Sequence, residues 1–289
     1  MHSIRIIPNH LQFSIPPFPI LIPPLAQMTS KGSAAYDLNL LLGQDSEKIT
    51  DHQLTACLSE LTRLGYTNIG LNRKISQKYV PPAEIPLIAL QSFPKMHFYS
   101  RITLELEDSS VNFGISSNPN ILKYDLIAVV PKSEKAFASA CSNLDVDLIT
   151  LDLSESRLPF QLRANLIGEA LRRGVRFEVN YAAALRDAGK RRNLFGNMTM
   201  LIRATRGKGI VLSSESSDPF EYRSAADICN MAFTLGLVGD LAFKSTKLNP
   251  KDALMNAANR KLTHKSTVSC LTEEAGEQSH LEQDFISFN

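Results

Sequence analysis

The sequence predicts an α/β fold, a TIM-like (β/α) barrel of about seven parallel strands. Short apolar runs alternate with segments of helical periodicity along most of the chain, as repeated β-α units do. The 289 residues are 44% hydrophobic, which is enough for one large core or two ordinary ones. The alternation continues without an internal break in composition, which favours a single closed barrel. A doubly wound open sheet is the alternative topology.

The elements follow one another in a regular order. Seven short segments, each bounded by turn or charge signals, are predicted strands: 36–42, 68–72, 100–106, 126–131, 148–153, 176–181 and 209–214. Helical periodicity predicts helices over 50–64, 133–141, 161–173 and 184–208. Ser133 is a typical helix N-cap, and Gly65 and Gly174 are typical stops after a helix C-terminus.

The two ends of the chain lack these patterns. Residues 1–33 form a Pro-rich leader without a charged side chain between Ile6 and Ser30, but its prolines would repeatedly break a membrane-spanning helix. After Cys270 the chain carries five acidic side chains and no basic one. We expect the leader and an acidic tail over 266–289 to be disordered, the barrel domain to span 34–265, and no membrane to be bound.

The four cysteines give no sign of a metal site or a disulfide framework. Cys57, Cys141, Cys229 and Cys270 are scattered without a C-x-x-C pair. This spacing argues against a zinc ribbon and predicts reduced thiols in an intracellular protein.

Positive charge is concentrated in one part of the chain. Segment 157–208 holds twelve Lys or Arg against three acidic residues, although the net charge of the chain is only +2. Such a segment is typical of a surface that binds polyanions, most often the phosphate backbone of a nucleic acid. An ordinary solvated surface is the alternative.

The helix predicted over 184–208 places these charges on one side. At about 100° per residue, one face holds apolar side chains: Leu194, Phe195, Met198, Leu201 and Ile202. Arg191 projects onto that face, so either the helix restarts after Gly189 or a buried carboxylate holds Arg191. The predicted nucleic-acid-binding residues on and around this helix are Lys132, Arg157, Arg186, Lys190, Arg191, Arg192, Arg203, Arg206 and Lys208.

Polar residues gather where the predicted strands end, which in a barrel is the mouth that carries function. They are Asp37, Asn39, Asn72, Arg101, Asp152, Glu178, Asn180, Ser213 and Ser214. Asp37 and Asn39 are two apart and should share one strand face, as should Glu178 and Asn180. The alternative to a functional site is a satisfied interior network, in which Glu105 or Glu178 neutralises Arg101.

Several motifs, taken in order, resemble one family. They are Tyr36-Asp-Leu-Asn, Leu64-Gly-Tyr, Ser100-Arg-Ile-Thr-Leu, Asp125-Leu-Ile-Ala-Val-Val-Pro, Leu144-Asp-Val-Asp-Leu-Ile, Arg173-Gly-Val-Arg-Phe-Glu-Val, Leu185-Arg-Asp, Arg191-Arg192 and Gly209-Ile-Val-Leu-Ser-Ser. Together, over about 36–262, they resemble the thirty-kilodalton protein subunit family of ribonuclease P and ribonuclease MRP.

The resemblance carries expectations for fold, role and partners. It implies a barrel akin to the polymerase and histidinol phosphatase (PHP) superfamily and a role in precursor-tRNA and rRNA processing. It also implies a nuclear, largely nucleolar location. The implied partners are the RNA of ribonuclease P or MRP, precursor tRNA indirectly, a small ferredoxin-like protein subunit and other subunits of the complex.

No residue pattern supplies catalytic chemistry. Phosphatase relatives of the implied fold place a metal-binding His-x-His pair at the end of the first strand, where this chain has Asp37 and Asn39. The six histidines lack ligand spacing, so no catalytic residue, metal or cofactor is predicted. The resemblance agrees, because in that family the RNA subunit supplies the catalysis. The alternatives are a metal-dependent phosphoesterase using Asp37, Asp152 and Glu178, and a protein-docking module.

Overall fold

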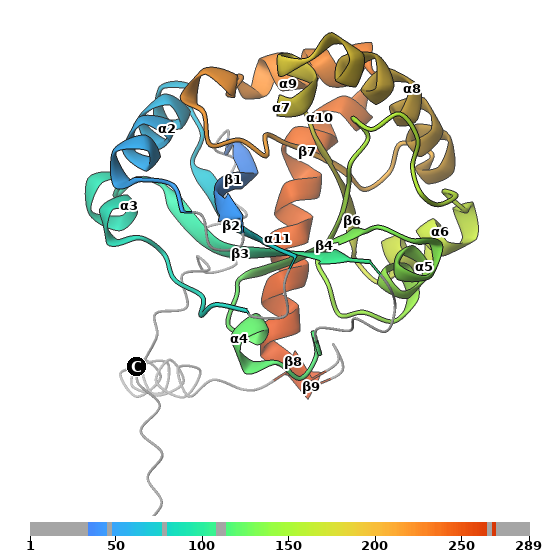
Figure 1. Cartoon of the computed structure of the whole chain (residues 1–289), viewed down its shortest axis with the longest axis horizontal. Helices are drawn as coiled ribbons and strands as arrows, with labels where there is room; N and C mark the ends of the chain where they lie inside the picture. Colours follow the sequence, from blue (N-terminus) through green and yellow to red (C-terminus); the bar gives the residue numbers. More distant parts are fainter. Residues whose placement is uncertain (1–33, 45–47, 77–79, 108–113, 265–267, 270–289) are drawn as a thin grey trace, which may run out of the picture.

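The computed structural model describes residues 34–44, 48–76, 80–107, 114–264 and 268–269 (Figure 1). The predicted leader, and all of the predicted acidic tail except residues 268 and 269, lie outside the described residues. Within the described ranges, no helix is both long enough and apolar enough to cross a membrane.

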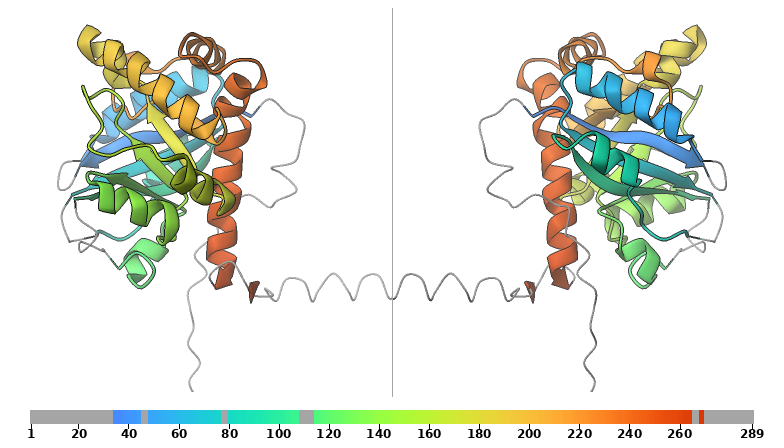
Figure 2. Two further views of the ribbon diagram at one scale, coloured as in Figure 1. Left: turned by 90° about the vertical axis from the view of Figure 1, so that its right-hand side faces the viewer. Right: turned by 90° about the vertical axis from the view of Figure 1, so that its left-hand side faces the viewer.

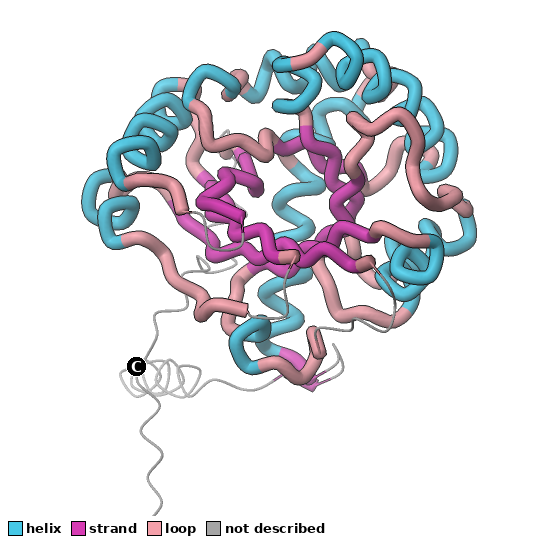
Figure 3. The backbone as a smooth tube through the Cα atoms, in the orientation of Figure 1, coloured by secondary structure: helices cyan, strands magenta, loops and turns pink. Residues whose placement is uncertain are grey.

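Seven parallel strands form one sheet in which each strand pairs with the next along the chain. They are β1 (Tyr36–Gln44), β2 (Asn68–Ile75), β3 (His97–Leu106), β4 (Leu126–Pro131), β5 (Leu148–Leu151), β6 (Arg176–Asn180) and β7 (Ile210–Ser213). A parallel bridge joins Leu40 of β1 to Ser216 just beyond β7, and Leu41 N donates to Ser216 O at 2.9 Å. The sheet therefore curls back to its first strand, and the ring of strands is visible in Figure 3. The TIM-like prediction is confirmed, and the open doubly wound alternative is wrong.

Helices surround this ring on the outside (Figure 1). They are α2 (Asp51–Arg63), α3 (Leu87–Ser92), α4 (Pro119–Leu122), α5 (Glu134–Ser142), α6 (Ala164–Arg172), α7 (Ala182–Arg186), α8 (Ala188–Thr205), the short 3₁₀ helix η1 (Pro219–Glu221), α9 (Ala225–Thr234) and α10 (Asp240–Thr246). The expected signals operate: Ser133 accepts a hydrogen bond from Ala136 N at the start of α5, and Gly65 follows α2 with a φ of 83°.

The single helix expected over 184–208 is two helices. Asp187 between α7 and α8 has extended backbone angles, and its Oδ1 accepts a hydrogen bond from Lys190 N at 2.7 Å. Asp187 is therefore the N-cap of α8. A restart was one of the two expected explanations for Arg191, but it falls after Asp187 and not after Gly189. Arg191 is exposed, and its Nη1 donates to Ala184 O at 3.3 Å.

The last long helix, α11 (Leu248–Leu262), covers one end of the barrel (Figure 2). Ala253, Leu254 and Ala257 pack against side chains from the first residues of several strands, including Leu126 and Leu148. This end is thus the N-terminal end of the strands, and it is closed by apolar packing. A short hairpin, β8 (Thr263–His264) with β9 (Val268–Ser269), follows the helix.

Ion pairs attach α11 to the strand starts, one of them from Asp252 to Arg176 at the start of β6 and two others to aspartates before β4 and β5. Arg260 Nη2 lies 2.9 Å from Asp147 Oδ2, and Lys261 Nζ lies 2.6 Å from Asp125 Oδ1. Both aspartates come just before strands, and Asp147 is completely buried. With this end closed, the opposite end of the barrel is the mouth that the polar residues were expected to line.

Candidate functional site

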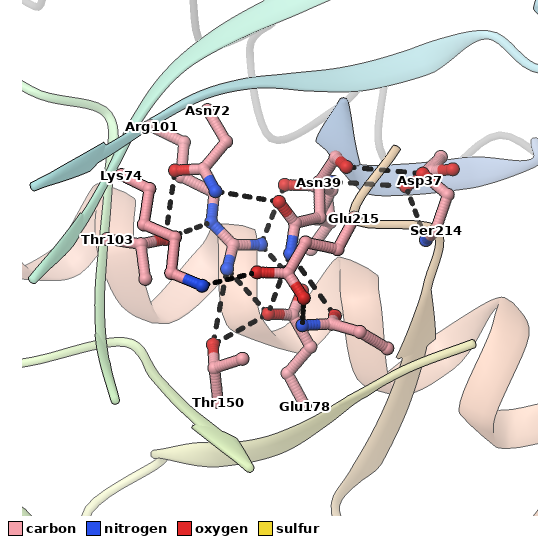
Figure 4. Close-up of polar contacts among 12 residues, drawn as sticks. Asp37, Asn39, Asn72, Lys74, Arg101, Thr103, Thr150, Glu178, Ser214 and Glu215 are labelled. Carbon is pink, nitrogen blue, oxygen red and sulfur yellow. Dashed lines mark hydrogen bonds and ion pairs between the residues drawn. The ribbon is translucent and has the colours of Figure 1, made fainter. Parts of the chain in front are cut away.

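The centre of the barrel holds a completely buried ion pair (Figure 4). Arg101 of β3 donates from Nη1 to Glu178 Oε1 and from Nη2 to Glu178 Oε2, each at 2.5 Å, and neither side chain is exposed. Such a two-pronged contact is the strongest arrangement available to a guanidinium and a carboxylate. Thr150 adds a hydrogen bond to Glu178 Oε2 at 2.7 Å. Glu178, and not Glu105, is thus the partner of Arg101.

A distortion in β1 brings a backbone acceptor to the same arginine. The register of β1 shifts between Asp37 and Leu40, and Leu38 O accepts a hydrogen bond from Arg101 Nη1 at 2.8 Å. The neighbouring residue on β2 is Gly70, where a Cβ would fall 2.2 Å from Leu38 O. Only glycine leaves room for this close backbone approach.

Amide side chains fill the space around the ion pair. Asn72 Nδ2 donates to Asn39 Oδ1 at 2.7 Å, and Asn39 Nδ2 donates to Glu178 Oε2 at 3.3 Å and to Asn180 Oδ1 at 3.2 Å. Thr103 Oγ1 donates to Asn72 Oδ1 at 2.9 Å. Five strands therefore contribute to one connected network, namely β1, β2, β3, β5 and β6.

A charged layer lies above this network at the mouth. Lys74 Nζ is 3.1 Å from Glu215 Oε1 and 3.5 Å from Glu105 Oε1, and Asn180 Nδ2 donates to Glu215 Oε2 at 2.8 Å. Lys132 Nζ is 3.7 Å from Glu105 Oε1. Glu215 has a φ of 53°, a left-handed conformation that is uncommon outside glycine. The amide of Glu215 donates to Asn39 O at 3.0 Å. This bond helps to hold the conformation of Glu215 at the seam of the barrel, where the residues after β7 meet β1.

The electrostatics follow from these contacts. Burial alone would raise the pKa of Glu178, but the charge and hydrogen bonds of Arg101 outweigh it, and the pKa lies below the usual value. Burial would lower the pKa of Lys74, but Glu215 and Glu105 outweigh it and the pKa is raised. Both groups therefore keep their charge at neutral pH.

Two predicted mouth residues lie elsewhere. Asp37 does not share a face with Asn39, because the register shift breaks the alternation of β1. Its Oδ1 instead accepts from Asn39 N at 3.0 Å and Ser214 N at 3.3 Å, next to the seam. Asp152 is exposed, and its Oδ1 accepts from Ser154 N and Ser154 Oγ.

The polar side chains at the mouth mostly bond to one another, although the buried hydroxyl of Ser213 has no hydrogen-bond partner among the described residues. Glu178 is engaged by Arg101, Asp152 faces solvent, and among the described residues no group of three or more His, Cys, Asp and Glu side chains could hold a metal ion. The arrangement does not gather the three carboxylates that the phosphoesterase alternative requires. Ser213, also predicted here, is buried beside Asn180 in the β6–β7 register.

The sequence interpretation missed three members of the network. Thr150 lies directly opposite Glu178 in the β5–β6 register, a signal that was available once both strands were predicted. Lys74 and Glu215 lie just beyond the ends of predicted strands. Nothing in the sequence pattern fixes how their side chains turn.

Two groups stand out among the cations of the basic segment. Four of these cations contact other parts of the fold. Arg163 pairs with Glu134, Arg176 with Asp252 and Arg186 with Glu221, while Arg173 donates to the carbonyls of Ala140, Cys141 and Leu144. Arg186 was predicted to contact RNA, and its Nε lies 2.9 Å from Glu221 Oε1 with the side chain 58% exposed.

The second group projects from α8 and the turn after it. These residues are all exposed: Lys190, Arg191, Arg192, Arg203, Arg206 and Lys208. Leu194, Met198 and Leu201 bury the opposite face of α8. Asn197 and Asn193 tie the helix to the loop after β5, through Asn197 Nδ2 to Leu153 O at 3.0 Å and Asn193 Nδ2 to Ser154 O at 3.0 Å. Arg157, which is also exposed, belongs to that loop.

One apolar residue departs from the predicted face of this helix. Phe195 is 42% exposed, whereas the polar Asn197 and Thr205 are buried. The buried stripe is therefore rotated away from Phe195. The two buried polar side chains have hydrogen-bond partners: Asn197 Nδ2 donates to Leu153 O and Glu155 O in the loop after β5, and Thr205 Oγ1 donates to Leu201 O at 2.8 Å.

The fold, the buried ion-paired network and the basic helix α8 together define a class of protein. It is a TIM-like barrel whose interior is filled by polar side chains and whose outer ring of helices includes a basic one. The chain belongs to the RNase P subunit p30 family, whose model matches residues 34–262. The resemblance seen in the sequence motifs is therefore confirmed.

Individual relatives agree. A probable ribonuclease P protein subunit 3 of Schizosaccharomyces pombe is 35% identical, over 76% of this chain and 93% of its own length. The ribonuclease P/MRP protein subunit RPP1 of Saccharomyces cerevisiae is 32% identical, over 80% of this chain and 83% of its own. The ribonuclease P protein subunit p30 of Mus musculus is 29% identical, over 79% of this chain and 88% of its own length.

A solved structure supports the fold. A chain from a cryo-EM structure of archaeal ribonuclease P with mature tRNA superposes with a TM-score of 0.57. The match covers 81% of this chain and 99% of that chain, at 18% identity. At that identity the similarity concerns the fold alone.

Proposed function

We propose that this protein is a non-catalytic, RNA-binding protein subunit of a ribonuclease P ribonucleoprotein, and of ribonuclease MRP. In this role it supports maturation of the leading end of precursor tRNA and processing of rRNA. The observation that carries the proposal is the exposed set of cations on α8 in a chain of the RNase P subunit p30 family. The relatives named above are ribonuclease P or MRP protein subunits.

The α8 cations suit contacts to phosphate. The guanidinium of an arginine can donate two parallel hydrogen bonds to one phosphate, whereas a lysine acts as a point charge. The buried face and the two asparagine tethers fix α8 against the barrel, so its outer face is presented as a rigid surface. The proposed surface also includes Arg157 in the loop after β5 and Lys132 after β4, and Arg186 contributes through the exposed part of its side chain.

The interior of the barrel has a structural role in this proposal. Its carboxylate and amide groups bond to one another, so the reaction is left to the RNA subunit, as the family resemblance implies. The proposal includes a PHP-like origin of the barrel, which would account for polar residues such as Asn39 at the place where phosphatases of that superfamily hold metal.

The proposal extends to partners and location. A small ferredoxin-like protein subunit and the ribonuclease P or MRP RNA are the expected direct partners, and precursor tRNA is contacted indirectly through the complex. The expected location is the nucleus, with the nucleolus as the main site, because rRNA processing occurs there.

The test is a salt titration of RNA affinity on the full chain. Arg192→Gln together with Arg203→Gln should weaken binding to ribonuclease P RNA and to unrelated RNAs alike, because contacts to phosphates position the RNA but do not distinguish its bases. The slope of log affinity against log salt should fall by roughly 0.7 to 0.9 for each lost contact. Thermal melting should be unchanged, because both side chains are exposed.

The matched control removes the same charge elsewhere, with Arg63→Gln on α2 and Arg163→Gln at the start of α6. Both of these arginines are exposed and form ion pairs of their own. Equal slopes for wild type and the folded α8 variant would overturn the RNA surface. If the α8 variant no longer binds a protein subunit while its salt slope is unchanged, the basic face is a protein-docking module. Chelator-sensitive phosphoester hydrolysis by the purified chain would favour the phosphoesterase.

A further inference from the structure

The outer face of α8 is not uniformly charged. Phe195 is 42% exposed and Met200 is 47% exposed, although the helix already buries Leu194, Met198 and Leu201 on its inner side. An aromatic ring left in water on a helix that has a full apolar face contributes little to the core of its own barrel. The ring lies among cations, because Arg191 and Arg192 precede it by four and three residues and therefore flank it on the helix surface.

Five exposed residues form one strip along this face, here called the saddle: Arg192, Phe195, Gly196, Thr199 and Arg203. At about 100° per residue, the two arginines point in nearly the same direction, three turns or about 16 Å apart along the axis. Between them lie Gly196, which has no side chain, and Thr199, whose side chain is short; both are exposed. A Cβ added at Gly196 would meet no other atom within 4 Å, so the space above the saddle is open.

We propose that this saddle binds an unpaired segment of RNA, with one nucleobase stacked on Phe195 and the flanking phosphates held by Arg192 and Arg203. The inference rests on the RNA-binding function proposed above and deepens it by naming the kind of RNA. In a duplex each base face is covered by its neighbours, so an aromatic side chain can stack only on bases in single strands, loops, bulges and ends. Phosphate cations on both sides of an exposed ring are the combination that single-strand binding surfaces use.

The charge around the ring decides between RNA and protein as the occupant. The buried core of a protein interface is depleted in charged residues, and its apolar side chains are contiguous. Here the exposed ring of Phe195 is flanked by Arg191 and Arg192, with Arg203 beyond Thr199. This charge is complementary to a polyanion that also offers flat apolar faces.

The experiment uses the full chain and two probes, a short single-stranded RNA containing a fluorescent adenine analogue and an RNA duplex long enough that its two ends, where base faces are open, are a small fraction of its binding sites. Phe195→Ala should weaken single-strand binding by about 5- to 100-fold, the range that corresponds to roughly 1 to 3 kcal/mol per stacked base. Duplex affinity and the salt slope should be unchanged. Phe195→Tyr keeps the ring and should restore binding, together with quenching of the analogue.

Two further variants separate binding from folding. Gly196→Leu fills the saddle and replaces a poor helix former with a good one, so melting should stay the same or rise while single-strand affinity falls. Phe220→Ala removes another exposed phenylalanine, 86% exposed on η1, and should leave binding to both probes unchanged.

The outcomes distinguish this inference from the function on which it rests. If Phe195→Ala leaves single-strand affinity intact while Arg192→Gln with Arg203→Gln lowers the salt slope, RNA binding stands and the stacking site is wrong. If the arginine variant has no effect on either probe, the proposed function fails together with it. Equal losses on the single strand and the duplex, or an equal loss in Phe220→Ala, would also overturn the stacking site.

Discussion

At the scale of single residues, the barrel depends on one buried ion pair whose partners cannot be exchanged independently. Arg101 and Glu178 are both fully buried, and each oxygen of Glu178 accepts from a different guanidinium nitrogen. Their mutual attraction offsets the loss of water around two charges only while both are present. Removing one partner leaves the other as an uncompensated charge inside the barrel.

Glu178→Gln should therefore lower the free energy of unfolding by about 3 to 5 kcal/mol, measured by urea denaturation. The double variant Glu178→Leu with Arg101→Met should cost less than the single one, because no charge is stranded. The sign with pH follows from the lowered pKa of Glu178: its stabilisation is present above the ordinary carboxyl range and is lost as the pH falls through the lowered value. A double variant less stable than Glu178→Gln would contradict this account.

The pH dependence of the stability contribution of Asp37 is opposite to that of Glu178. Burial raises its pKa, while hydrogen bonds from Ser214 and Asn39 oppose the rise. Its contribution to stability is therefore complete below the ordinary aspartate pKa and is lost as the pH rises through the raised value. Asp37→Asn keeps an oxygen acceptor for the two amides and removes the buried charge.

We expect Asp37→Asn to melt higher than wild type at neutral pH, with a difference that shrinks on acidification towards about pH 4. Melting curves across this range provide the measurement. A variant that melts lower than wild type at pH values near 7 would show that the charged form is the favoured one.

At the scale of elements, α8 shows what periodicity can and cannot predict. The sequence correctly indicated an amphipathic basic helix, and Leu194, Met198 and Leu201 are buried as expected. The periodicity predicted that Phe195 is buried, because apolar rings are usually buried. It does not reveal that the side chain of Asn197 is buried through hydrogen bonds to two carbonyls of a loop distant in sequence.

The corrected face gives a prediction for stability. Met198→Ala should lower the free energy of unfolding by about 2 to 5 kcal/mol through the cavity it leaves, because Met198 is fully buried. Phe195→Ala should change it by less than about 1 kcal/mol, because its ring is 42% exposed. Denaturation of the two variants side by side tests the helix register, and equal losses would mean that the register is wrong.

The strands were predicted more completely than the site they carry. Alternating apolar runs reveal where strands lie, because burial on both faces leaves a local signal. The barrel-mouth residues Asn39, Asn72 and Arg101 were also identified. The position of Asp37 was not, because the shift in β1 depends on Gly70 of the next strand and has no signature within β1 itself.

At the scale of the whole molecule, the described residues form a TIM-like barrel without the two ends of the chain, and one bridge joins β1 to the residues after β7. The ring is joined at the seam, and α11 covers the N-terminal ends of the strands. We therefore propose that residues 1–30 and 272–289 contribute nothing to the core, in line with their composition.

Deleting both segments should leave thermal melting and assembly with RNA and protein partners unchanged, within about 0.5 kcal/mol of stability. Each deletion should also be made separately, so that an effect can be assigned to one end. A loss of more than about 1 kcal/mol from either would show that this end packs against the barrel.

The seam between β1 and the residues after β7 also sets an order of events during folding. Every other strand pair joins neighbours along the chain, but the contact of Ser214 with Asp37 spans 177 residues. Loop closure over such a distance has an entropic cost, and long-range contacts slow folding. On a ribosome, β1 is made first and must keep an unpaired edge until the last strand emerges, so the first strand of this barrel is the longest exposed to wrong pairing.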